Sequence, residues 1–150
     1  MATNVAFSPT HDQSGLKISP SLVTDYKRAH QEMLAALSAM DELAQESAPN
    51  QLRLSHTRLR ITRASTESRV AFGKVAAALS QVASPSVART IDTLEHLHLE
   101  LREIAKRHLS TWTHAQAQED WVGYCRSSEE VRRRWRELIK RESKLLYPLL

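Results

Sequence analysis

Two histidines and two glutamates stand at positions where they could bind a metal ion. His30, His98 and Glu142 fall on the apolar faces of three predicted helices, and Glu67 lies at the edge of the apolar face of a fourth. Imidazole and carboxylate groups that converge in a helical bundle are the ligands with which such folds build iron or manganese sites. The alternative is a buried hydrogen-bonded pair, such as His30 with Glu142, that holds the helices in register. Spacing alone leaves both interpretations open.

Glu142 is the most informative of these residues because it interrupts an apolar stripe. The stripe recurs at steps of four and three residues, which keeps one face of a helix turned toward its neighbours. Its members are Val131, Trp135, Leu138, Glu142, Leu145 and Leu149. A carboxylate in such a stripe is costly to bury unless a cation, a metal ion or a hydrogen bond meets it. We therefore expect Glu142 to face a partner inside the protein.

Four amphipathic helices are expected to position these residues, with boundaries near 20–46, 51–82, 84–117 and 127–147. The first and third begin with a serine followed by a proline, and a Ser127–Glu130 capping box predicts the start of the fourth after a connector at 118–126. No strand-like alternation competes with this pattern. The sequence therefore predicts an all-α, up-down-up-down four-helix bundle over residues 20–150, preceded by a flexible tail at residues 1–19.

Composition narrows the class of protein further. The chain has 150 residues, enough for one domain, and a single cysteine, Cys125, so no internal disulfide can form. We see no secretory signal and no apolar run long enough to span a membrane, so we predict a cytoplasmic protein with no membrane partner. The net charge of +4 permits anionic partners without requiring nucleic acid, and we expect none. No phosphate loop or nucleophile motif is present, so we predict that the protein is not an enzyme.

The remaining polar and aromatic residues are assigned to solvent or to packing. His108 continues the stripe of the third helix and is expected to close the core at one end, roughly 15 Å from His98. The histidines expected to be exposed are His56, His96 and His114. The aromatic residues expected to pack near the connector are Trp112, Trp121, Trp135 and Tyr124. The arginines expected to lie mostly on a solvated face of the second helix are Arg53, Arg58, Arg60, Arg63 and Arg69.

The end of the chain carries a recognisable motif. From Glu142 it reads Glu-Ser-Lys-Leu-Leu-Tyr-Pro-Leu-Leu, and the four helices present His, Glu, His and Glu in that order. This pattern resembles the hemerythrin-like (HHE cation-binding) family over about residues 21–150. The resemblance implies a four-helix bundle with a non-haem di-iron centre that binds oxygen or senses oxygen, nitric oxide or iron. It also implies that His30, Glu67, His98 and Glu142 occupy ligand positions.

Three departures from the family pattern change the expected function. Leu138 and Arg63 stand where ligand histidines precede the two glutamates in the family, and Arg102 stands where some members carry another histidine. A di-iron site rich in imidazole cannot be assembled from the ligands that remain. We therefore predict a hemerythrin-like bundle with a reduced or lost iron site, acting as a binding or regulatory module with a protein partner or as a homodimer.

Two alternative functions remain open from the sequence. The first is a non-haem iron protein that binds oxygen or nitric oxide, or stores iron, through His30, Glu67, His98 and Glu142. The second is a histidine phosphotransfer bundle with an exposed reactive histidine. Such domains place small residues after that histidine, whereas His96 and His98 are followed by leucine, glutamate and arginine, so we rank this alternative below the others.

Overall fold

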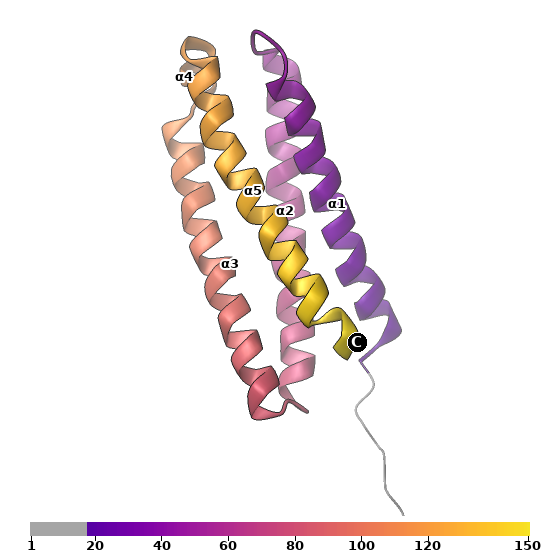
Figure 1. Cartoon of the computed structure of the whole chain (residues 1–150). Coiled ribbons are helices and arrows are strands. Elements are labelled where there is room, and N and C mark those ends of the chain that lie inside the picture. Colours follow the sequence, from indigo (N-terminus) through magenta and orange to yellow (C-terminus); the bar gives the residue numbers. More distant parts are fainter. Residues whose placement is uncertain (1–17) are drawn as a thin grey trace, which may run out of the picture.

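The part of the chain that the structure describes is helical almost throughout. The structure is a computed structural model that describes residues 18–150. Within these residues there are five α-helices, one short 3₁₀ helix and no strand. In chain order they are α1 (Pro20–Ala44), α2 (Gln51–Ser80), α3 (Pro85–Thr111), α4 (His114–Glu119), α5 (Trp121–Leu145) and the 3₁₀ helix η1 (Tyr147–Leu149). The predicted all-α class is therefore confirmed, and Figure 1 shows the four long helices lying side by side.

Two further predictions concern the start of the chain and the membrane. The flexible tail predicted for residues 1–19 falls outside them, apart from Ile18 and Ser19 just before α1. Across residues 18–150, no helix combines the length and the apolar character that a bilayer span requires. The cytoplasmic location stays a prediction.

The helix starts follow from side chains that satisfy the free amides of a first turn. Asn50 accepts a hydrogen bond from the amide of Arg53 at the start of α2, and Ser84 accepts one from the amide of Val87 at the start of α3. Pro85 occupies the first position of α3, where a missing amide hydrogen costs nothing. These starts agree with the predicted boundaries within a residue or so.

The start of the last long helix was predicted wrongly. The expected connector at 118–126 is instead the end of α4 and the first turn of α5, and the expected cap Ser127 lies inside α5. Asp120 caps α5, since its side chain accepts a hydrogen bond from the amide of Gly123. The earlier start is favoured because Trp121 and Tyr124, three residues apart, both become buried on one face of the helix.

The core has two parts that lie along the bundle. The larger is built around Met33, Leu37, Phe72 and Trp135, and α1 packs most closely on α2 while α3 packs most closely on α5. The smaller gathers under α4 and contains Met40, Leu43, Leu54, Ala117, Trp121 and Tyr124. Each large apolar side chain buried in this way stabilises the fold by about 1.5–3 kcal/mol.

The apolar stripe of α5 ends earlier than predicted. Val131, Trp135, Leu138 and Glu142 are buried, but Leu145 and Leu149 are 42% and 43% exposed. Leu146 is fully buried in their place. The α-helix stops at Leu145 and the chain tightens into η1, so the helical periodicity no longer decides which residues face inward.

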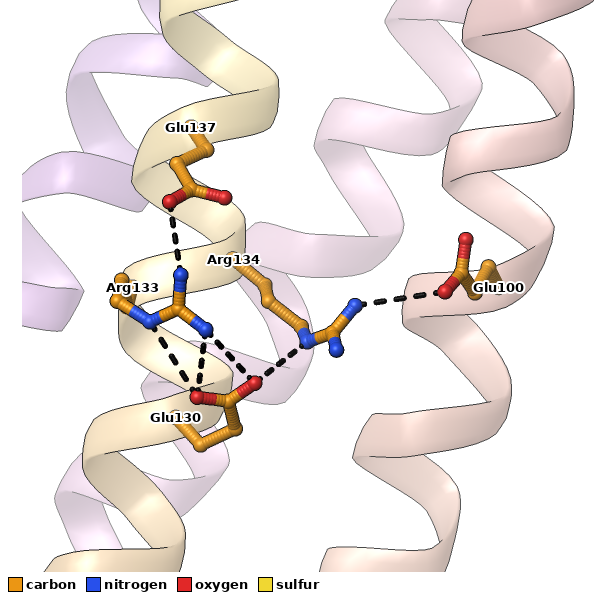
Figure 2. A network of polar contacts seen from close by, with 5 residues as sticks. All are labelled: Glu100, Glu130, Arg133, Arg134 and Glu137. Atoms are coloured by element: carbon orange, nitrogen blue, oxygen red, sulfur yellow. Dashed lines mark hydrogen bonds and ion pairs between the residues drawn. The ribbon is translucent and has the colours of Figure 1, made fainter.

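A network of ion pairs covers the outer face of α5, as Figure 2 shows. Arg133 donates to Glu130 and Glu137 on its own helix, and Arg134 donates to Glu130 and, at 3.4 Å, to Glu100 on α3. The exposed fractions of the five side chains range from 37% to 61%, so water and salt screen each pair and weaken it. The network therefore orients α5 against α3 without dominating the stability of the fold.

Candidate functional site

A buried carboxylate lies between two imidazoles at the centre of the candidate site. Glu142 is 0% exposed, and each of its carboxylate oxygens accepts one hydrogen bond. The Nε2 atom of His30 donates to Oε2 at 2.9 Å, and the Nε2 atom of His98 donates to Oε1 at 2.7 Å. An ionised carboxylate can only accept hydrogen bonds, so both histidines carry a proton on Nε2. We refer to His30, Glu142 and His98 as the triad.

The triad forms because three helices turn their buried faces toward one point. His30 follows Tyr26 by one turn on the inner face of α1, and His98 lies between Leu94 and Leu101 on the inner face of α3. Glu142 comes one turn after buried Leu138 on α5. The same spacing that builds the core therefore delivers the polar groups to a dry interior.

His30 is held on its second ring nitrogen as well. Its Nδ1 lies 2.6 Å from the hydroxyl of Tyr147, which η1 places beside it directly after α5. With the proton of His30 on Nε2, the Tyr147 hydroxyl donates to Nδ1. The rings of Tyr26 and His30 also pack against one another, with centroids 4.4 Å apart. His30 is thereby fixed in both position and tautomer.

His98 is surrounded by aromatic rings instead. It stacks on Phe72 of α2 with centroids 4.3 Å apart and meets Trp135 edge-on at 6.2 Å. Its Nδ1 is buried and has no hydrogen-bond partner. An unpartnered lone pair on a neutral imidazole is less costly to bury than an unpartnered N–H, so this environment favours the tautomer with the proton on Nε2.

The triad keeps Glu142 ionised although it is buried. Burial by itself raises the pKa of Glu142, but hydrogen bonds from His30 and His98 outweigh it and hold the pKa below its ordinary value of 4.5. Burial also raises the pKa of Tyr26 far above its usual range, and the negative charge of Glu142 raises it further. The buried Tyr26 hydroxyl makes no hydrogen bond. At neutral pH the site therefore contains a carboxylate and a neutral phenol.

The structure brings together three of the four predicted metal-site residues. Glu67 is exposed and lies in a groove beside α1, together with Thr66 and Val70, and neither carboxylate–imidazole pair of the triad involves it. Leu138, at the position of an expected ligand histidine, is buried in the core, while Arg63 is exposed. The ligands of a dinuclear centre are therefore not assembled at one point.

The triad residues themselves fit a metal ion poorly. Metal-bound histidines usually donate the other ring N–H to a carboxylate, a carbonyl or water. The second nitrogen of His30 has such a partner in Tyr147, but that of His98 has none. Between residues 18 and 150, no group of three or more histidine, cysteine, aspartate or glutamate side chains has an arrangement suited to a metal ion. Hydrogen bonds alone account for the geometry.

His98 also forms part of the wall of a cavity that sequence reasoning missed. The cavity has a volume of about 580 Å³ and its walls come from all four long helices. Arg58 and Arg69, which were assigned to a solvated helix face, line it. So does His108, whose pKa is lowered to about 4 by burial and then by the charges of Arg58 and Arg132. The predicted exposure of His56, His96 and His114 is confirmed.

Comparison with known proteins identified no relative of this chain. Neither family models nor curated proteins nor solved structures gave a match to this chain. The relation to hemerythrin-like proteins therefore rests on the residues of the triad and of the closing motif, and it belongs with the proposals that follow.

Proposed function

We propose that this chain is a hemerythrin-like, up-down-up-down bundle whose iron site has been replaced by a hydrogen-bonded triad, and that it acts as a non-enzymatic binding or regulatory module. The observation that carries the proposal is the full engagement of Glu142. Both of its carboxylate oxygens accept hydrogen bonds from imidazole Nε2 atoms, which are the atoms that would otherwise face a metal ion.

The loss of ligands on two helices supports the same conclusion. On α5, Leu138 fills the space one turn before Glu142 with an apolar side chain that is 3% exposed. On α2, Glu67 points to the surface, and Phe72 supplies the contact with His98. Hydrophobic packing therefore takes the place of coordination on two of the four long helices.

The triad has a structural role that explains why polar groups persist in this core. It joins α1, α3 and α5 at one point, and two fixed tautomers allow only one register of these helices. A buried ion is costly, roughly several kcal/mol before compensation, so it stabilises the fold only when every partner is in place. A frame fixed in this way can hold a binding surface without taking part in chemistry.

Metal analysis of protein purified from iron-supplemented cells without chelator tests the proposal. We expect far less than one iron per chain, and we expect the free energy of unfolding to be unchanged by a strong iron chelator, because no metal linkage supports the fold. The matched variants are His98→Ala and the exposed His96→Ala on the same helix. Stoichiometric iron that is retained by His96→Ala and lost from His98→Ala would overturn the proposal.

A mononuclear iron protein that binds oxygen or nitric oxide is the second candidate. One observation favours it, namely that two imidazoles and one carboxylate converge, which is the ligand set of many mononuclear non-haem iron sites. The experiment above separates the two candidates, since this one requires one iron per chain and its loss on changing His98 or Glu142.

A further inference from the structure

The cavity beside His98 has an apolar interior of a size that suits a small molecule. Its walls include Leu37 and Met40 of α1, Ile61 of α2 and Trp135 of α5. The first two of these are almost fully buried, at 0% and 1% exposed. Its volume of about 580 Å³ falls within the range of about 300–1,000 Å³ in which drug-sized ligands are bound. The pairs α1/α2 and α3/α5 pack closely, whereas α2 and α3 contact each other much less, and the cavity lies between these two less closely packed helices.

The charged side chains around this cavity all carry the same sign. They are Arg58, Arg69, Arg102, Lys106 and Arg132, and no aspartate or glutamate is among the lining residues. Arg132 pairs with Asp41 of α1, which also pairs with Arg136. The other four have no carboxylate partner within residues 18–150. A concave surface with apolar walls and unpaired cations concentrates a positive potential and attracts anions.

A buried polar atom at the edge of the cavity has no partner. His98 lines the cavity and is only 6% exposed, yet its Nδ1 makes no hydrogen bond. Its Nε2 donates to Glu142, so Nδ1 presents a lone pair that can only accept a hydrogen bond, for example from a hydroxyl group of a bound molecule. Buried polar atoms without a partner are rare, but an acid group offers only acceptors, so the cations of α2 and α3, and not His98, would hold it.

We infer that this cavity binds a small organic anion with an apolar body, of the class of medium-chain or aromatic carboxylates and phosphate esters. The apolar body lies against Leu37, Met40 and Trp135, and the acid group lies among the cations of α2 and α3. A bare inorganic anion would leave the apolar walls unmatched, and a neutral hydrocarbon would leave the cations unmatched. The inference rests on the proposed binding role, but it does not depend on whether iron is bound.

Fluorescence titration with 1-anilinonaphthalene-8-sulfonate, an aromatic anion, tests the inference on the full chain. We expect one probe per chain, weaker binding of the neutral analogue N-phenyl-1-naphthylamine, and displacement by octanoate or octyl phosphate but not by inorganic phosphate. The two octyl compounds distinguish a carboxylate from a phosphate as the preferred acid group. Near-ultraviolet circular dichroism of the tryptophans verifies that the protein stays folded.

Charge variants on α3 provide the decisive comparison. Arg102 and Lys106 are exposed, lie one turn apart and line the cavity, so Arg102→Gln with Lys106→Gln leaves the core intact. We expect this double variant to weaken probe binding by about tenfold or more, equivalent to about 1.4 kcal/mol. The matched control is Arg89→Gln with Arg107→Gln on the same helix, both exposed and outside the cavity, and it should bind as the wild type does.

A space-filling variant tests the location independently of charge. Ala105 is half-buried and lines the cavity, so Ala105→Phe should abolish probe binding while the protein remains folded. If that variant does not fold, the charge comparison still decides the matter. Equal binding by the charge variant and its control, equal affinity for the neutral analogue, or displacement by inorganic phosphate would each overturn the inference. Metal content is measured on the same samples, so a failure here is distinct from a failure of the proposed loss of iron.

Discussion

Replacing Glu142 by glutamine tests how the triad stabilises the fold. Glutamine keeps the shape but removes the charge, so its carbonyl oxygen accepts from one imidazole and its amide must donate to the other. The amide is expected to face His30, because that ring can carry its proton on Nδ1 instead. The Nδ1–H group then donates a hydrogen bond to the half-exposed Tyr147 hydroxyl. His98 cannot do so without burying an unpartnered N–H.

The size of the effect follows from the two hydrogen bonds. Bonds to a charged group contribute about 1.5–3 kcal/mol each and neutral bonds about 0.5–1.5 kcal/mol, so exchanging two of them costs about 2–3 kcal/mol. For a chain of 150 residues this lowers the melting temperature by roughly 4–12 °C. Urea unfolding followed by far-ultraviolet circular dichroism measures the difference, with Glu129→Gln on the exposed face of α5 as the control.

The stability difference between the wild type and Glu142→Gln should depend on pH. The folded-state pKa of Glu142 is depressed below 4.5, so its contribution to stability is fully present above that pH and is lost as the pH falls through the folded-state value. The wild type and Glu142→Gln should therefore differ most near neutral pH and converge in acid. Unfolding curves that stay the same distance apart at every pH, or that coincide throughout, would refute the reasoning.

The same variant predicts a coupling with Tyr147. In the wild type, Tyr147→Phe removes the hydroxyl that donates to Nδ1 of His30, and this nitrogen can remain a bare lone pair. In the Glu142→Gln background, the same change removes the only acceptor for the Nδ1–H group of His30. We expect the second loss to exceed the first by about 1 kcal/mol in a double-mutant cycle. Additive effects would show that His30 does not change its tautomer.

Three further predictions concern other parts of the fold. Gly123→Ala should destabilise by about 1–2 kcal/mol in thermal unfolding, because the added carbon would overlap the carboxylate of the capping residue Asp120 and come within 2.8 Å of an indole carbon of Trp112. Gly73→Ala, in open space within a helix, should stabilise by about 0.5–1 kcal/mol; the reverse order would contradict the packing at the start of α5. Asp41→Asn should cost about 1–2 kcal/mol near neutral pH by leaving buried Arg132 without its counter-ion. Burial raises the pKa of Asp41, but hydrogen bonds from arginines lower it more, so in urea unfolding the cost should be full above pH 3.8 and be lost as the pH falls through the lowered folded-state pKa. The carbon-bound ring protons of His108 should titrate by NMR with a midpoint near 4, and stability should fall as the pH drops from 6.5 toward 4, because the unfolded chain takes up that proton first; a midpoint near 6.5 would show that the ring is solvated.

Helix positions and the burial of the triad could be predicted because local rules decide them. Ser84 and the proline after it mark the start of α3 through amide satisfaction alone. His30, His98 and Glu142 lie on stripes whose apolar neighbours must be buried, so their own burial follows. The predictions that failed depend on competition between local signals or on tertiary packing.

The position of Glu67 and the start of α5 illustrate these two causes. Glu67 lies at the edge of the apolar face of α2, where a small rotation of the helix decides between core and solvent, and packing against α1 turned it outward. At the start of α5, Asp120 and Ser127 both qualify as caps, and burial of Trp121 favours the earlier one. The cavity has no local signature, because it arises between α2 and α3, which pack less closely than the pairs α1/α2 and α3/α5.

Nitrogen–proton NMR correlation of the histidine rings, in protein purified from iron-supplemented cells, distinguishes a hydrogen-bonded triad from a metal site. We expect sharp, solvent-protected signals from the Nε2 protons of both His30 and His98, since both donate to Glu142. We also expect Glu142→Gln to move the proton of His30 to Nδ1 while His98 keeps its own on Nε2. Unprotonated Nε2 atoms in both rings, or broadening of both rings by a bound paramagnetic ion, would show instead that the triad is a metal site.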